Sequence, residues 1–414
     1  MVAASGPEGS MNSAHLLEEK LLPLMREMVM NTCVNTGQKS SGQEIRSVES
    51  LERLFQTYGL NGKRFEKAPG RTSLLVRLPG TNPQAPSLML MGHTDVVPAR
   101  EEDWLHPPFQ AVVEDGHLWG RGCVDMLNWT ASQAVALAQA WKDYGPFEGD
   151  VLFLALADEE ASGHYGSQWI TREFWQEVRT DYMVTELGGF WMDGASGPVV
   201  SLTSGEKGLC WLRISTHGIA GHGSTPYHSK NAVLSLAKAA EILSRDHQPL
   251  AISPVYQAMA HIIGGPLEQD LLSPEKHHQA LEQIYLKNPG IARYLHTSSH
   301  QTRSIGLFSG GTKVNIIPDH ASMDVDIRFP REKTSQQIID QVKTELAPLK
   351  EDFQVELLEY FPRNQSSTHN PLTQAIADLV EHHYPSTGIC PMITGGVTDG
   401  RFWRAKGTQV YGFN

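Results

Sequence analysis

Three segments of the chain contain an almost continuously apolar run that is followed by a His or a carboxylate. They are SLMLMGHTD (87–95), DVLFLALADEE (150–160) and TDYMVTELGG (180–189). A strand with one face in water alternates polar and apolar residues, so continuous apolar runs indicate strands covered on both faces. Helical patterns lie between them, as in LNWTASQAVALAQAWK (127–142). This alternation predicts an α/β domain whose mixed, largely parallel sheet is covered by helices.

The pattern changes near residue 209. Strand-like and helix-like segments then follow in the order βαββαβ, which predicts an inserted ferredoxin-like α+β domain with one open sheet face. The segments are 209–218, a helix from Asn231, 313–318, 322–330, 335–347 and 353–360. Within this part, residues 247–305 form a partly helical insertion. A helix at 371–384 and a strand at 408–413 resume the first pattern, so the first domain is expected to continue after the insertion.

We therefore expect four parts along the chain. They are a disordered leader (1–14), a first domain in two pieces (15–208 and 362–414) and the inserted domain (209–361). The leader has neither the basic region nor the apolar region of a secretory signal.

Net charge argues against two classes of partner, and the cysteines indicate the cellular location. The net charge of −12, from 46 acidic and 34 basic side chains, argues against a nucleic-acid or anionic-membrane partner. No apolar run reaches the roughly 18–20 residues of a membrane span. The four cysteines are far apart and form no C-x-x-C pair, which predicts free thiols and a cytoplasmic location.

The ends of the apolar runs carry residues that bind metals. His93 ends the first, Asp158, Glu159 and Glu160 end the second, and Glu186 ends the third. In open α/β sheets ligands bind at the carboxyl ends of the strands, so these side chains are expected at one edge. Nitrogen and oxygen donors without thiolate suit zinc, with cobalt or manganese as alternatives.

A fourth segment, WGRGCVDMLN, places Asp125 just before a helix. Each of these residues taken alone has an ordinary structural explanation: His93 as a core histidine, Asp125 as a helix cap, and the glutamates as surface charges. Their convergence on one sheet edge favours a metal site, because otherwise each position would need a separate explanation.

Two neighbours of these residues have predicted supporting roles. Asp95 lies two residues after His93 and shares its strand face, so its carboxylate is expected to accept a hydrogen bond from the imidazole. Of the adjacent pair Glu159 and Glu160, one can bind metal while the other acts as general base. The spacing leaves open which residue does which.

Six motifs then carry a resemblance to a known superfamily. In order they are MGHTDVVPA, GRGCVDM, ADEEASGHYG, TELGG, GIAGHGSTPYHSKNA and KVNIIPDHASMDVDIR. Together they resemble the zinc-dependent acetylornithine deacetylase, succinyl-diaminopimelate desuccinylase, aminoacylase and carboxypeptidase superfamily, from about residue 15 to 414. The resemblance implies that the inserted domain is a lid that also mediates homodimerisation, and that each subunit binds two zinc ions.

The resemblance also implies the metal ligands. Asp125 would bridge the two ions, His93 and Glu186 would complete one site, and Glu160 with a C-terminal His would complete the other. In the family that His lies beyond the strand corresponding to TQVYGF, whereas this sequence ends at Asn414. Either the sequence is truncated before this His or the second zinc site lacks a ligand, and we expect truncation. His369 matches no family position and is expected to be a loop residue.

The remaining implied roles concern catalysis and substrate. Glu159 would act as general base and acid towards a metal-bridging water, and His222 would stabilise the oxyanion across the dimer. Asn315 and Arg328 would bind substrate, with a turn residue as the alternative for His222 and an ion pair to Asp324 or Asp326 as the alternative for Arg328.

The expected activity is hydrolysis of an N-acyl amino acid. The alternatives are a carboxypeptidase or dipeptidase acting on short peptides, and a non-catalytic, metal-poor homologue. Glu at position 186, rather than Asp, resembles the deacylase members.

Overall fold

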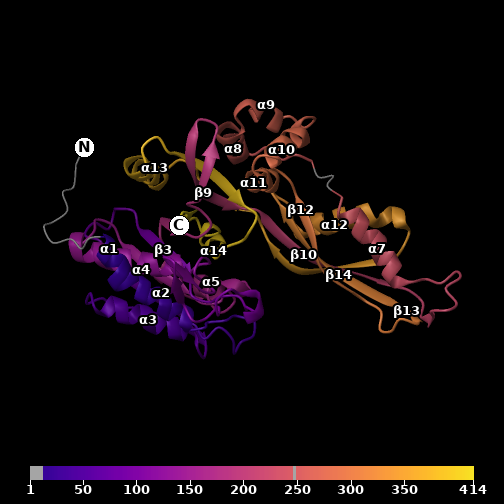
Figure 1. Cartoon of the computed structure of the whole chain (residues 1–414), viewed down its shortest axis with the longest axis horizontal. Helices are drawn as coiled ribbons and strands as arrows, with labels where there is room; N and C mark the ends of the chain where they lie inside the picture. Colours follow the sequence, from indigo (N-terminus) through magenta and orange to yellow (C-terminus); the bar gives the residue numbers. More distant parts are fainter. Residues whose placement is uncertain (1–12, 246–248) are drawn as a thin grey trace. The chain divides into compact units, whose positions relative to one another are not determined.

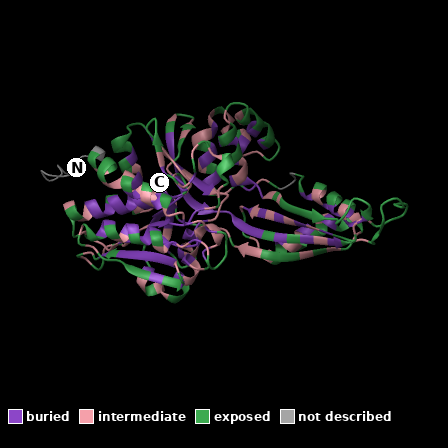
Figure 2. Cartoon of the chain, turned by 60° about the horizontal axis from the view of Figure 1, so that its bottom comes forward, coloured by how far each residue is buried: buried purple, intermediate pink, exposed green. Residues whose placement is uncertain are grey.

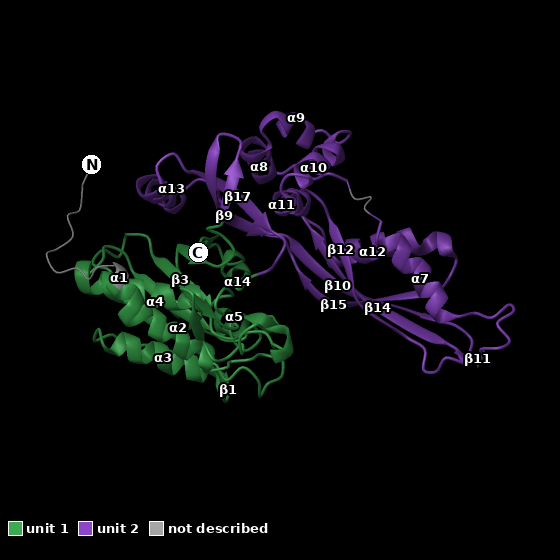
Figure 3. Ribbon diagram, in the orientation of Figure 1, with its two compact units in different colours: residues 1–190, 398–414 green, residues 191–397 purple. Residues whose placement is uncertain are grey.

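The chain divides into two compact units (Figure 3), Met1–Phe190 with Thr398–Asn414, and Trp191–Val397. The computed structural model describes residues 13–245 and 249–414, so residues 1–12 of the predicted leader lie outside the described part. The unit boundaries differ from the predicted ones at 208 and 361. The physical reason is that helices between residues 254 and 299 pack on two strands that flank the predicted inserted domain, as described below.

The first unit is built on a six-stranded stretch of sheet in the order β1-β2-β6-β3-β7-β18. The bounds are β1 (Lys63–Ala68), β2 (Arg71–Leu78), β3 (Leu88–His93), β6 (Val151–Leu156), β7 (Tyr182–Thr185) and β18 (Gln409–Gly412). The β6-β3, β3-β7 and β7-β18 pairs are parallel, while β1-β2 and β2-β6 are antiparallel. The predicted mixed, largely parallel sheet is therefore confirmed.

Both faces of this sheet are covered, which explains the continuous apolar runs. In β6, Phe153 and Ala155 pack in one core while Leu152, Leu154 and Leu156 pack in another. All five side chains are fully buried, and buried residues follow the central strands in Figure 2. Successive strand residues point to opposite faces, so an apolar residue is needed at every position.

Helices from separate parts of the sequence form the two cores. The first face is covered by α2 (Leu22–Met30), α3 (Ile45–Gln56) and α4 (Leu127–Tyr144), which contact one another (Figure 1). The second is covered by α5 (Ser167–Glu173), α6 (Trp175–Val178) and α14 (Gly400–Arg404). Smaller elements of this unit are α1 (Ser13–Leu16), β4 (Val112–Glu114) and β5 (His117–Trp119).

The second unit contains a four-stranded antiparallel sheet in the order β12-β14-β10-β15. Its elements are β10 (Gly208–His217), α7 (Ala232–Leu243), β12 (Thr302–Gly310), β14 (His320–Phe329), α12 (Ser335–Leu346) and β15 (Phe353–Phe361). Helices α7 and α12 pack on one face and bury Leu212, Val325 and their neighbours. Element order and strand order are those of a ferredoxin-like domain. The segment predicted as a strand at 313–318 forms only β13 (Ile316–Ile317), paired with β11 (Gly221–His222).

The partly helical insertion has its own core in the second unit. Its helices pack on β9 and β17, with Tyr256, Met259 and Leu295 buried against Met392. The elements are β8 (Trp191–Gly194), β9 (Gly197–Glu206), α8 (Pro254–Gly264), α9 (Glu268–Leu271), α10 (His277–Tyr285), α11 (Pro289–Ser299), β16 (Asn364–Gln365), α13 (Pro371–His383) and β17 (Gly388–Thr394). Among the helices in the described ranges, none combines the length and apolar character needed to cross a bilayer.

Candidate metal centre

His93 is fixed at the end of β3 by close packing against α4. A Cβ atom at Gly92 would lie 2.3 Å from the Thr130 hydroxyl oxygen, so glycine permits the approach, and that hydroxyl donates to the His93 carbonyl at 2.9 Å. The imidazole is 1% exposed. Its Nδ1 lies 2.9 Å from the Asp95 backbone carbonyl. A carbonyl oxygen can only accept a hydrogen bond, so Nδ1 carries the N–H, and in the neutral ring Nε2 has the lone pair that a metal would bind.

Three predicted ligands meet around this Nε2 atom. His93, Asp125 and Glu186 each offer a ligand atom, and these atoms all lie within 4.8 Å of one another. The Nε2 atom is 3.2 Å from Asp125 Oδ1 and 3.9 Å from Glu186 Oε2. Asp125 precedes α4 and Glu186 follows β7, so three separate connections of the sheet supply the group. One imidazole and two carboxylates without thiolate fit zinc, cobalt or manganese.

The charge balance of the site also fits a cation. Burial raises the pKa of Glu186 to about 8, that of Glu160 to about 7 and that of Glu159 well above its usual value. Among the described residues, no lysine or arginine forms an ion pair with these carboxylates or with Asp125. A divalent ion would supply the missing positive charge.

Glu159 and Glu160 occupy different positions relative to this group. The Glu159 carboxylate is 3.9 Å from His93 Nε2 and its side chain is 13% exposed, so it lies beside the ligands. Glu160 lies outside the three-residue group. Both follow Asp158, whose φ of +72° turns the chain sharply after β6.

Asp95 supports the site in a way that the sequence predicted only in part. The predicted hydrogen bond from the His93 ring is accepted by the Asp95 backbone carbonyl, while its carboxylate Oδ1 is 3.5 Å from Nδ1. The buried carboxylate instead accepts hydrogen bonds from the backbone N–H groups of Glu159 (3.2 Å) and Glu160 (3.1 Å). Burial raises the pKa of Asp95, but the interactions with His93 and the hydrogen-bond donors outweigh this, and the pKa is lowered.

One residue of the site escaped the sequence analysis. Asp399, just before α14, is 1% exposed, and burial raises its pKa to about 6. It accepts a hydrogen bond from the Ser167 hydroxyl, while its Oδ2 atom has no partner in the described part of the chain. Its charge raises the pKa of Glu159 and Glu186, which places it electrostatically within the same site. An Asp before a short helix looks like a cap, and the sequence gives no other signal.

The predicted substrate residues belong to the second unit. His222 is exposed on β11, with Nδ1 2.7 Å from the Ser224 hydroxyl, and the Asn315 carbonyl accepts from Gly223 N–H at 2.8 Å. Arg328 donates to both carboxylate oxygens of Asp326, at 2.7 and 3.1 Å, which is one of the two ion pairs considered as its alternative role. His369 is an exposed loop residue.

Comparison with known proteins places this site in a family. The chain is 28% identical to human N-fatty-acyl-amino acid synthase/hydrolase PM20D1 over 358 residues, covering 82% of this chain and 69% of that protein. It is 26% identical to pig aminoacylase-1 over 377 residues, covering 89% and 81%.

Solved structures share the fold at low sequence identity. The M20 family metallo-carboxypeptidase Sso-CP2 from Sulfolobus solfataricus superposes with a TM-score of 0.72 at 15% identity, covering 97% of this chain and 91% of that one. Human carnosine dipeptidase 1 superposes with a TM-score of 0.69 at 15% identity, covering 97% and 89%. The profile of Peptidase family M20/M25/M40 matches residues 89–414, a range that contains His93, Asp125, Glu159, Glu160 and Glu186. The resemblance seen in the motifs is therefore confirmed, and the chain belongs to Peptidase family M20/M25/M40.

Proposed function

We propose that this M20-family hydrolase cleaves the amide bond of N-acyl amino acids with the help of bound zinc. The observation that carries the proposal is the group of His93, Asp125 and Glu186, in which His93 and Glu186 are buried and Asp125 is exposed, with the Glu159 carboxylate 3.9 Å from His93 Nε2. Ligands and a free carboxylate at one sheet edge are what metal-assisted hydrolysis requires.

The residues divide the work as follows. His93, Asp125 and Glu186 would hold one ion, and Asp125 with Glu160 would contribute to a second. When bound, zinc lowers the pKa of water and polarises the substrate carbonyl. Glu159 takes the proton from the attacking water and returns it to the leaving amine. Its position favours this role, because its carboxylate lies beside the three candidate ligands and not among them.

The choice of substrate rests on the sequence relatives. PM20D1 and aminoacylase-1 are named for N-acyl amino acid chemistry, and they match over more than four-fifths of this chain. The dipeptidase and carboxypeptidase structures are 15% identical and support the fold alone. We therefore place N-acyl amino acids ahead of dipeptides and of a non-catalytic role.

A substrate panel tests the proposal. Zinc-loaded protein is assayed on N-acetyl and N-lauroyl amino acids and on matched dipeptides. We expect higher kcat/KM on the N-acyl compounds, and faster dipeptide cleavage would reject the deacylase assignment. Glu159→Ala is expected to lower turnover by about 10²–10⁴-fold while zinc content stays unchanged. Unchanged turnover would exclude Glu159 as the base, and no turnover of either substrate class by the zinc-loaded wild type would favour the non-catalytic alternative.

We further propose a homodimer in which His222 and Asn315 contribute to the substrate site. Support comes from edge strand β12, where Leu307 and Phe308 are 65% and 46% exposed, and from the exposed β11 that carries His222. Sedimentation and assay together test this, because a fully active monomer would contradict it. The four free cysteines support a cytoplasmic, reducing environment.

A further inference from the structure

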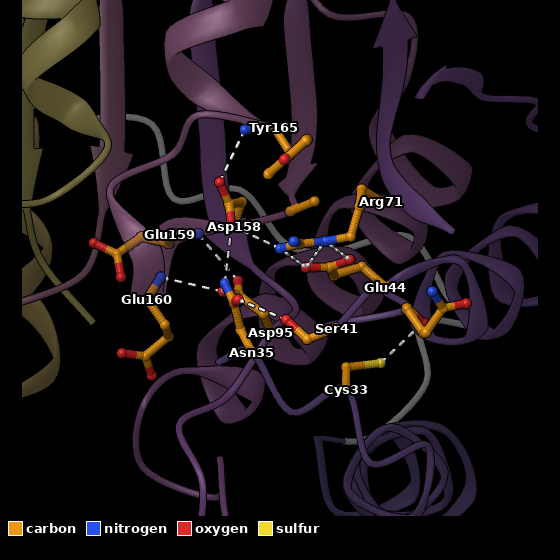
Figure 4. A network of polar contacts seen from close by, with 12 residues as sticks. Cys33, Asn35, Ser41, Glu44, Arg71, Asp95, Asp158, Glu159, Glu160 and Tyr165 are labelled. Carbon is orange, nitrogen blue, oxygen red and sulfur yellow. Dashed lines mark hydrogen bonds and ion pairs between the residues drawn. The ribbon is translucent and has the colours of Figure 1, made fainter. Parts of the chain in front are cut away.

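Five buried polar residues lie behind the turn that carries Glu159 and Glu160, and we call them the support network. They are Asn35, Glu44, Arg71, Asp95 and Asp158, shown in Figure 4. None is more than 3% exposed. Three carboxylates and one guanidinium without access to water are costly to bury, so their geometry must provide compensating interactions.

Arg71 anchors one end of this network at the start of β2. Its Nη2 atom donates to Glu44 Oε1 at 2.8 Å and to Asp158 Oδ1 at 2.7 Å, and its Nε donates to Glu44 Oε2 at 2.8 Å. The planar fork of an arginine can satisfy two carboxylates in fixed directions. Tyr165 closes this end, because its ring lies 5.0 Å from the Arg71 guanidinium carbon and its N–H donates to Asp158 Oδ2 at 2.8 Å.

Asn35 connects this anchor to Asp95. Its side-chain amide donates to Asp158 Oδ1 at 3.0 Å and to Asp95 Oδ2 at 2.8 Å. The Asp95 carboxylate then accepts from the backbone N–H groups of Glu159 and Glu160. An unbroken series of hydrogen bonds therefore runs from Arg71 to the backbone of the two glutamates (Figure 4).

We propose that Arg71 and Asn35 are positioning residues for the general base. Arg71 and Asn35 fix the carboxylates of Asp158 and Asp95. Asp158 then accepts a hydrogen bond from the Tyr165 N–H after the turn, and Asp95 accepts from the N–H groups of Glu159 and Glu160 within it. The turn needs such support, because Asp158 sits in the left-handed backbone region that non-glycine residues rarely adopt. The catalytic part of this inference rests on the proposed function, whereas the positioning of the turn does not.

The test separates positioning from simple stability. Asn35→Ala and Arg71→Lys are compared with wild type, and Arg77→Lys is the matched control because Arg77 lies on the same strand in an exposed ion pair with Asp150. Hydrogen exchange of the Glu159 and Glu160 amides is measured on metal-free protein, with the β3 and β6 amides as internal references. For zinc-loaded protein, kcat and KM are measured on the best substrate.

We expect the two turn amides to exchange about tenfold faster or more in both variants, with the strand amides unchanged. Turnover should fall by up to about 10²-fold at nearly constant KM, because a misplaced base slows chemistry more than binding. The Arg77→Lys control should match wild type in both measurements. Asn35→Ala keeps the test valid if Arg71→Lys does not fold.

The outcomes are distinguishable. Turn exchange within twofold of wild type in a folded variant overturns the positioning role. Faster exchange of strand and turn amides alike also overturns it, since that would be general loss of stability. If the variants loosen the turn but wild-type, zinc-loaded protein hydrolyses no amide, the positioning role stands and the proposed function fails.

Discussion

Two groups of carboxylates lie next to each other at one sheet edge. They differ in how many hydrogen-bond donors the protein supplies to them. In the support network each carboxylate meets N–H donors: Asp95 accepts three hydrogen bonds, Asp158 three and Glu44 three. The second group, here called the ligand group, consists of His93, Asp125 and Glu186 with the adjacent Glu159. Among the residues described, no N–H or O–H group other than the His93 ring approaches the carboxylates of Glu159 and Glu186. The first group has hydrogen-bond donors from the protein itself, although burial still raises the pKa of Glu44 to about 7. In the described part of the chain, the second group lacks such donors apart from the His93 ring.

The difference shows how a fold can hold the backbone of a metal site in place while no metal is bound. Removing water from carboxylates destabilises a protein unless donors or cations replace it. The support network provides those donors and fixes the backbone. In the ligand group this compensation has to come from a bound cation. Burying these carboxylates therefore destabilises the metal-free protein, and metal binding is expected to stabilise it.

Metal removal should have the largest effect, because it acts on the ligand group as a whole. Treating zinc-loaded protein with a chelator is expected to lower turnover by more than about 10³-fold and to lower the Tm, and added zinc should restore both. Metal content and turnover are measured on the same samples. Full turnover at far less than one metal per chain would show that the ligand group does not need a cation.

Breaking the support network should have the next largest effect. Arg71→Met leaves Glu44 and Asp158 buried beside an apolar side chain, and we expect the free energy of unfolding to fall by about 3–5 kcal/mol. Urea denaturation of metal-free protein measures this. Arg77→Met, which breaks an exposed pair, should cost at most about 1 kcal/mol. Equal effects would mean that burial of the network has no special energetic role.

The same substitution should change stability in opposite directions in the two groups. Glu186→Gln removes a buried carboxyl group whose ionisation the fold opposes, so metal-free protein near neutral pH is expected to gain about 0.5–2 kcal/mol while zinc affinity falls. The equivalent change Asp95→Asn removes a carboxylate whose pKa the fold lowers and whose hydrogen bonds hold the Glu159 turn, and it should lose about 1–3 kcal/mol. Urea midpoints of the two metal-free variants against wild type decide the matter. A loss of stability in both would remove the distinction drawn between the groups.

The last expected effect is a pH dependence of the stability of the metal-free protein. Burial raises the pKa of Glu186 from 4.5 to about 8, so between these values the unfolded chain has lost this proton while the folded chain retains it. Folding stability should therefore decrease as pH rises from about 5 to 8. The buried His93, whose pKa its carboxylate neighbours raise well above 6.5 despite burial, contributes in the same direction. Tm measured against pH should show this slope in wild type and a shallower one in Glu186→Gln, and a Tm that rises with pH in metal-free protein would contradict it.

The sequence predicted the parts of the site that follow from local pattern. His93, Glu159 and Glu186 follow apolar runs, and parallel strands bring their carboxyl ends to one edge, so periodicity alone indicated the convergence. The same reasoning missed β9, because GPVVSLTSGE is polar in composition although eight of its ten residues are buried, from Val199 to Glu206. Strand β9 pairs with β16 and with β17, which lie far from it in the sequence, and no local pattern encodes these contacts.

The support network could not be read from the sequence for a related reason. Asp158 was grouped with its glutamate neighbours as a metal-binding residue type, but it turns away from them onto Arg71, 87 residues earlier. Asn35 and Glu44 lie in loop and helix-start segments where polar residues are common. Their function exists only through contacts between distant segments, and Asp399 was missed for the same reason.

The Asp95 side chain has a consequence for moving this site into another protein. β3 and β6 are aligned with His93 opposite Leu156, and Asp95 ties the chain just after β3 to the turn just after β6. A slip of one residue between the strands would reverse the direction of the side chains and break this tie at once. A designer who copied only the metal-binding residues onto a new scaffold would therefore transfer the donor atoms without the alignment that aims them. The smallest transferable unit is the paired strand ends together with Asp95 and Asn35.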